Sequence, residues 1–119
     1  MTMRLSPLLC DLIARGEPAV LVTVAEALGS TPREAGVRML VTAGGLSGTI
    51  GGGRLEWEAH QRARAMLASG EAAAALDLPL GPAVGQCCGG RVVLRLERAS
   101  EATLSALETL ETQEQRALP

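Results

Sequence analysis

The sequence is poor in aromatic residues, has no lysine and contains a single histidine. One tryptophan is present, without phenylalanine or tyrosine, so the core must be built from Leu, Val, Ile, Met and Ala. One histidine limits general acid–base chemistry and allows no serine–histidine–acid arrangement. All eleven basic residues are arginines. That count has two readings: a codon bias toward arginine, or bidentate recognition of an anion by individual arginines.

Three further absences narrow the class of protein. The net charge of −2 argues against general nucleic-acid binding, which needs a basic surface. No stretch approaches the roughly 20 apolar residues that span a bilayer, and the start lacks the apolar segment of a signal peptide, so we expect no membrane association. Three cysteines, an odd number, do not form a disulfide framework. We therefore expect a reduced, cytoplasmic setting.

Hydrophobic periodicity and turn residues predict a single domain over residues 1–119. The expected helices and strands, in chain order, are helix 8–15, strands 19–25, 37–42 and 46–50, helix 54–69, a short strand at 72–78, strand 91–97, and helix 100–115. The segment 72–78 is ambiguous, because its alanines favour a helix whereas its short length and the proline at 79 fit an edge strand. The fold class is α+β (mixed α/β), a small sheet of about four to five strands covered by three helices.

Several side chains receive structural interpretations from this pattern. Ser6 is expected to cap the first helix with Pro7 at its first position, and Ser100 to cap the last. Cys10 is expected to be a buried structural thiol. Trp57 is expected to pack in the core, and His60 to face solvent on a charged helix face.

Three glycine-containing loops, at 29–36, 48–53 and 81–90, follow expected strands, where ligands often bind. In the second loop, Gly51, Gly52 and Gly53 directly precede a helix. Free N–H groups and the helix dipole would suit phosphate or another anion there, and Arg54 could add a guanidinium. The alternative is a tight turn. No Walker or dinucleotide-binding pattern is present, so nucleotide hydrolysis is poorly supported.

The first loop offers Ser30, Thr31 and Arg33 as ligands for an anion, unless the two hydroxyls only satisfy the backbone of a turn. Glu56 could orient Arg54 or accept a hydrogen bond from a ligand, and a solvated surface position is equally compatible with the sequence.

In the third loop, Gln86, Cys87 and Cys88 stand between glycines, where the backbone can approach another molecule closely. Either thiol could be a nucleophile or a redox group if its pKa were lowered. The spacing does not fit a structural zinc site. The pattern favours a binder with soft sulfur ligands over a self-sufficient catalyst.

The order and spacing of three segments resemble the N-terminal domain of the xanthine dehydrogenase accessory factors, the XdhC/CoxI family. These segments are Gly29–Glu34 (GSTPRE), Gly48–Glu56 (GTIGGGRLE) and Gly85–Gly90 (GQCCGG). The resemblance spans roughly residues 19–97. Family members usually continue into a C-terminal Rossmann-like domain, which we expect to be absent from this chain.

The resemblance implies a non-catalytic chaperone that transiently binds the molybdenum cofactor, molybdopterin with its metal. Such a chaperone holds the cofactor during sulfuration by a cysteine desulfurase and delivers it to an apo xanthine dehydrogenase or related molybdenum hydroxylase. The implied cofactor-binding residues are Ser30, Thr31, Arg33, Gly51, Gly52, Gly53, Arg54, Glu56, Gln86, Cys87 and Cys88, with the two cysteines as molybdenum ligands. The alternative is a thiol-dependent sulfur carrier or enzyme that uses Cys87 or Cys88. The sequence leaves the oligomeric state open, a homodimer included.

Overall fold

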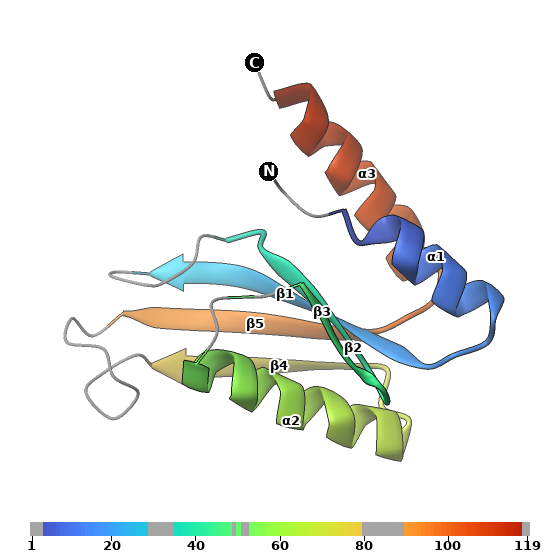
Figure 1. Cartoon of the computed structure of the whole chain (residues 1–119). Helices are drawn as coiled ribbons and strands as arrows, with labels where there is room; N and C mark the ends of the chain where they lie inside the picture. Colours follow the sequence, from blue (N-terminus) through green and yellow to red (C-terminus); the bar gives the residue numbers. More distant parts are fainter. Residues whose placement is uncertain (1–3, 29–34, 49, 51–52, 80–89, 118–119) are drawn as a thin grey trace.

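The computed structural model describes residues 4–28, 35–48, 50, 53–79 and 90–117 (Figure 1). Within these residues it has three helices and five strands: α1 (Ser6–Ala14), β1 (Ala19–Leu28), β2 (Arg38–Thr42), β3 (Gly45–Gly48), α2 (Gly53–Ser69), β4 (Ala73–Pro79), β5 (Arg91–Arg98) and α3 (Glu101–Ala117). This arrangement confirms the expected α+β class. The described part of the chain contains no helix that is long and apolar enough to cross a membrane.

The five strands form one antiparallel sheet in the order β3-β2-β1-β5-β4. The β-branched run after Ala19 makes β1 the central strand, as its apolar composition predicts for a strand with neighbours on both sides. Its register with β5 shifts between Val24 and Glu26. Because one extra residue reverses the alternation of side chains, Ala27 packs on the same core as Val24.

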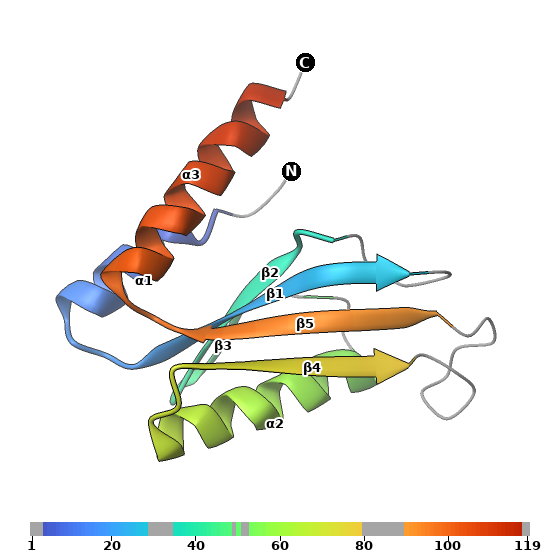
Figure 2. The same ribbon diagram turned by 180° about the vertical axis from the view of Figure 1, so that it is seen from behind.

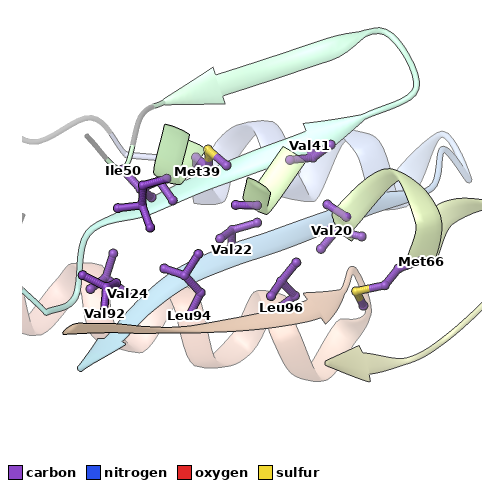
Figure 3. Packing of buried hydrophobic residues seen from close by; sticks show 13 residues of the cluster. Val20, Val22, Val24, Met39, Val41, Ile50, Met66, Val92, Leu94 and Leu96 are labelled. Carbon is purple, nitrogen blue, oxygen red and sulfur yellow. The ribbon is translucent and has the colours of Figure 1, made fainter. Parts of the chain in front are cut away.

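The larger core lies between α2 and one face of the sheet (Figure 3). Every second residue of β1 and β5 points toward α2, together with residues of β2 and Ile50. The buried members are Val20, Val22, Val24, Met39, Val41, Ile50, Leu55, Ala59, Ala63, Met66, Val92, Leu94 and Leu96. Small alanines on α2 let the helix approach the sheet closely, which compensates for the lack of aromatic side chains in this core.

A second, smaller core lies on the opposite face of the sheet, under α1 and α3. The two helices pack together near the end of the sheet where β1 begins and β5 ends (Figures 1 and 2). Its buried residues are Leu5, Leu9, Leu12, Ala19, Leu21, Leu40 and Leu107. Seen from behind, α2 and the α1–α3 pair lie on opposite sides of the sheet (Figure 2).

The start of α1 differs from the expectation. Ser6 is the first helical residue, the N-cap is Leu5, and neither supplies a capping side chain to α1. The Glu111 carboxylate of α3 instead accepts hydrogen bonds from the backbone N–H groups of Leu5 and Ser6. The prediction that Cys10 is buried is also wrong, because its side chain lies on the exposed side of α1. By contrast, Ser100 caps α3, since its Oγ accepts from the Thr103 N–H at 3.2 Å.

Candidate functional site

One end of the sheet anchors all three glycine loops that the sequence singled out. The ends of three adjacent strands meet here, because Arg91 of β5 is the register partner of both Leu28 in β1 and Pro79 in β4. The first loop follows the end of β1. The third loop connects the end of β4 to the start of β5. The α2 helix begins at this same end (Figure 1). Ile50 lies there too, in the core beside Val24 and Val92 (Figure 3). The three segments, far apart in sequence, therefore share one end of the fold.

The start of α2 carries one exposed arginine, Arg54, and two carboxylates, Glu56 and Glu58. Gly53 has φ +62°, and a Cβ placed on it would meet no atom of the described residues within 4 Å. The Arg54 side chain is 58% exposed and contacts Glu58 at 3.3 Å, one turn further along. Such an exposed ion pair contributes little free energy, so the guanidinium can turn to an incoming anion. The first N–H groups of a helix have no acceptor within the helix itself, so a helix start can donate to a ligand.

Glu56 secures the chain just before the glycines. Its Oε1 accepts a hydrogen bond from the Ile50 N–H at 3.3 Å, and Ile50 is itself fully buried. The half-buried Glu56 is therefore not a solvated surface residue. It is placed to position the chain between β3 and α2.

Gly48 shows that the path into this loop requires glycine. Its φ is +86°, and an added Cβ would lie 3.1 Å from the Arg38 carbonyl oxygen and 3.4 Å from the Met39 Cα. The backbone conformation therefore strains any residue with a Cβ here, and the neighbouring backbone would have to shift slightly to admit that atom.

Two further α2 residues differ from expectation. Trp57 is 55% exposed, so the prediction that it packs in the core is wrong. The helical period could have predicted this exposure. Trp57 lies two residues from both Leu55 and Ala59, and both of those residues face the sheet. His60 is only partly exposed, and its Nε2 is buried with no hydrogen-bond partner among the described residues, so the prediction of a solvent-facing histidine is also wrong.

Arg91 also lies at this end of the sheet, but its guanidinium is engaged. Its Nε and Nη2 each donate to Asp77 at 2.6 Å, and these hydrogen bonds hold the pKa of Asp77 below its ordinary value. Arg54 is therefore the more available guanidinium at the loop-bearing end of the described fold.

Among the predicted site residues, the structure brings Gly53, Arg54 and Glu56 together on the first turn of α2. The others lie outside the described residues, so the predictions about them stay predictions: Ser30, Thr31, Arg33, Gly51, Gly52, Gln86, Cys87 and Cys88. Within residues 4–28, 35–48, 50, 53–79 and 90–117, no group of three or more His, Cys, Asp or Glu side chains could hold a metal ion.

Comparison with solved structures finds a related fold. A crystal structure described as a xanthine dehydrogenase from Bacillus halodurans is similar to this chain, with a TM-score of 0.69 and 23% sequence identity. The similarity covers 90% of this chain but 34% of that one, so the chain spans about a third of that protein's length. At this identity the similarity establishes the fold alone. No curated protein matches the chain.

The sequence profile of the XdhC and CoxI family matches residues 12–78, more than half of the 119 residues. The matched segment runs from α1 to β4 and contains Gly48, Glu56 and the whole of α2. It therefore includes the helix start that the geometry singles out. The chain belongs to the XdhC and CoxI family.

Proposed function

We propose that this chain is the cofactor-binding part of an accessory protein for xanthine dehydrogenase-type molybdenum hydroxylases. It would hold the molybdenum cofactor during sulfuration by a cysteine desulfurase and then deliver it to the apo-hydroxylase. The observation that carries this proposal is the family match over residues 12–78, which includes the α2 start. The similarity to a longer protein described as a xanthine dehydrogenase is consistent with it.

The described residues at the α2 start fit the anionic part of such a cofactor. No atom of the described residues lies within 4 Å of a Cβ placed on Gly53, and the Arg54 guanidinium is exposed within the same turn. Backbone N–H groups and an arginine fork are the donors that a phosphate needs. The exposed indole of Trp57, one turn along from Gly53, offers an aromatic surface at this end of α2.

Each group would have a distinct part in holding the cofactor. Arg54 would bind the phosphate, and Glu56 would keep the chain at Ile50 in place so that the neighbouring N–H groups face outward. Cys87 or Cys88 would supply a soft sulfur ligand to molybdenum. The bound cofactor would supply the metal centre of the target enzyme, while this chain contributes binding and orientation without a catalytic group of its own.

The test is equilibrium binding of isolated molybdenum cofactor to the 119-residue chain under anaerobic, reducing conditions. Arg54→Ala should weaken binding about tenfold, because it removes a charge-assisted hydrogen bond to the phosphate. The matched control is Arg64→Ala, which removes the same side chain from an exposed position further along α2 and should leave affinity unchanged.

Cysteine variants separate this proposal from the sulfur-carrier alternative. Loss of binding in Cys87→Ala or Cys88→Ala would identify the metal ligand. A chain that binds no cofactor but accepts a labelled persulfide on one cysteine from a desulfurase would instead favour a sulfur carrier. Equal affinities for Arg54→Ala and Arg64→Ala would show that α2 does not bind the phosphate.

A further inference from the structure

Among the described residues, the outer edge of β4 has few of the features that normally block strand pairing. β4 is last in the sheet order, and its register with β5 runs without a bulge over seven residues. It carries no basic side chain, and Pro79 stands at its last position. The opposite edge, β3, has only four residues, two of them glycines. Because long, flat and sparsely charged edges readily pair with another strand, β4 is the edge that stays competent to do so.

The hydrogen-bond pattern shows which groups face outward. The Arg98 N–H donates to the Ala72 carbonyl at 2.9 Å, which sets the phase of the β4–β5 ladder. Even-numbered residues 74–78 therefore bond to β5, and odd-numbered residues 73–77 direct their N–H and C=O groups away from the sheet. Pro79 is also odd-numbered, so its backbone nitrogen faces away from β5, and the missing N–H removes no hydrogen bond between β4 and β5.

We propose that two copies of this chain associate through their β4 edges, antiparallel and about a two-fold axis at Ala75. In this register Ala75 lies opposite Ala75 of the second copy, and Ala73 lies opposite Asp77 of the second copy. These pairs use every outward N–H of residues 73–77, each pair exchanging two hydrogen bonds. The two sheets would then join into one continuous sheet.

The side chains favour this register over its neighbours. On the α2 side, Leu76 would lie opposite Ala74 of the second copy, a large residue against a small one, and would extend the apolar row that includes Leu94. A register centred on Asp77 would instead place two carboxylates opposite each other and would require an N–H from Pro79. The Ala75 register avoids both penalties and pairs all three outward-facing residues of β4 with one another.

The interface is expected to be weak. One pair of seven-residue strands buries less than the roughly 1,200–2,000 Å² of a stable complex. The α2 helix packs more on β1 and β2 than on β4, so the proposed contact would consist mainly of the two paired strands. A concentration-dependent dimer with a Kd on the order of 10–100 μM is the expected result.

Sedimentation equilibrium over 1 μM to about 1 mM tests the association. Ala75→Lys places two ammonium groups opposite each other, each beside an Arg95, and should raise the Kd at least tenfold. Ala75 is exposed, so this change should leave the monomer folded. Ala106→Lys, an equal charge change at an exposed α3 position, is the control and should leave the Kd within twofold. A wholly monomeric chain, or equal effects of the two lysines, would overturn the proposal.

Cysteine cross-linking tests the register, in a background with Cys10, Cys87 and Cys88 replaced by serine. Ala75→Cys should oxidise to a disulfide-linked dimer, because directly opposed Cα atoms about 5.5 Å apart suit a disulfide. Ala73→Cys should not, because the two copies of residue 73 would be four residues, roughly 13 Å, apart along the strands. Equal cross-linking of both variants would contradict the Ala75 register.

Discussion

Replacing Glu111 with alanine should destabilise the fold by releasing the start of α1 from α3. Glu111 is 3% exposed, and its carboxylate accepts the Leu5 N–H at 2.8 Å and the Ser6 N–H at 3.3 Å. The Ser6 hydroxyl donates to the other oxygen at 2.5 Å, and Arg4 Nε lies 3.4 Å from it. A single carboxylate of α3 thus satisfies the backbone donors that open α1.

The magnitude follows from the groups left without partners. Loss of an N-cap acceptor destabilises a helix by about 1 kcal/mol. Buried donors deprived of their acceptor add about 1–3 kcal/mol. The sum, about 2–4 kcal/mol, is a large fraction of the total stability of about 5–15 kcal/mol that small domains have. For a chain of this size it corresponds to a fall in Tm of about 10 °C.

The pH dependence has a definite sign. Burial by itself would raise the pKa of Glu111, but hydrogen bonds from the Ser6 hydroxyl and from the Leu5 and Ser6 N–H groups outweigh it, and the pKa lies below its ordinary value. A carboxyl whose pKa is depressed in the folded state stabilises the fold above its unfolded pKa, near 4.5, and loses that contribution as the pH falls through the folded value. Glu111→Gln should remove this part of the acid dependence.

The assay is urea unfolding followed by far-UV circular dichroism, since the exposed Trp57 would report poorly on folding by fluorescence. Glu108→Ala is the matched control, because it removes an exposed carboxylate from the same helix one turn earlier. The control should change the free energy of unfolding by less than about 0.5 kcal/mol. If Glu111→Ala and Glu108→Ala were equally stable, the proposed role of the Glu111 carboxylate would be wrong.

Three further predictions are measured by the same unfolding assay. Gly48→Ala should destabilise the fold by at least 1 kcal/mol more than Gly36→Ala, since both residues have positive φ but only Gly48 is crowded by backbone. Similar losses of stability in the two variants would show that no clash occurs at Gly48. Glu114→Gln should lower the free energy of unfolding by about 1–3 kcal/mol, because it leaves the Arg38 guanidinium, which is 6% exposed, without its carboxylate. Arg38→Met should keep the free energy of unfolding within about 1 kcal/mol of wild type. A destabilised Arg38→Met beside an unchanged Glu114→Gln would refute this. Leu94→Ala should cost about 2–5 kcal/mol in the larger core, and a loss below 1 kcal/mol would mean that this site repacks freely.

Much of the fold could be predicted from local patterns. The β-branched run at 20–24 predicted the central strand, the alternation after Arg91 predicted β5, and Pro79 predicted an edge strand. Each depends on the period of side chains along one segment, which the sequence displays directly. The expected third strand at 46–50 was too long, because Gly48 turns the chain out of β3.

The errors arose where partners are distant in sequence. Ser6 has the residue type of an N-cap, but Glu111 takes that role from 105 residues away, and no local pattern indicates such a pair. The apolar stripe of α1 did not reveal that Cys10 would lie outside it. Trp57 could have been placed correctly, because the spacing of Leu55 and Ala59 puts it off the buried face.

The candidate site was predicted in part. The glycines before α2 and the neighbouring Arg54 were recognised from residue type, and the structure places that arginine on an exposed helix start. The role of Glu56 was left open, because its hydrogen bond to the Ile50 N–H spans a turn whose course depends on the packing of Ile50. Residue type therefore indicated the chemistry, whereas tertiary packing determined how the groups are held.

The contacts that stabilise the α1 start and the proposed binding site lie at opposite ends of the strands. The second core and the Glu111 carboxylate lie under α1 and α3, at the end where β1 begins, whereas the glycine loops leave the end marked by Leu28 and Arg91. Glycine carries a high entropic penalty on ordering, so we expect the two cores to supply most of the stability. The larger core connects the two ends, because it runs beneath α2 from Met66 to Ile50. Substitutions beneath α3 should therefore alter unfolding without altering affinity, and substitution of the exposed Arg54 should do the reverse.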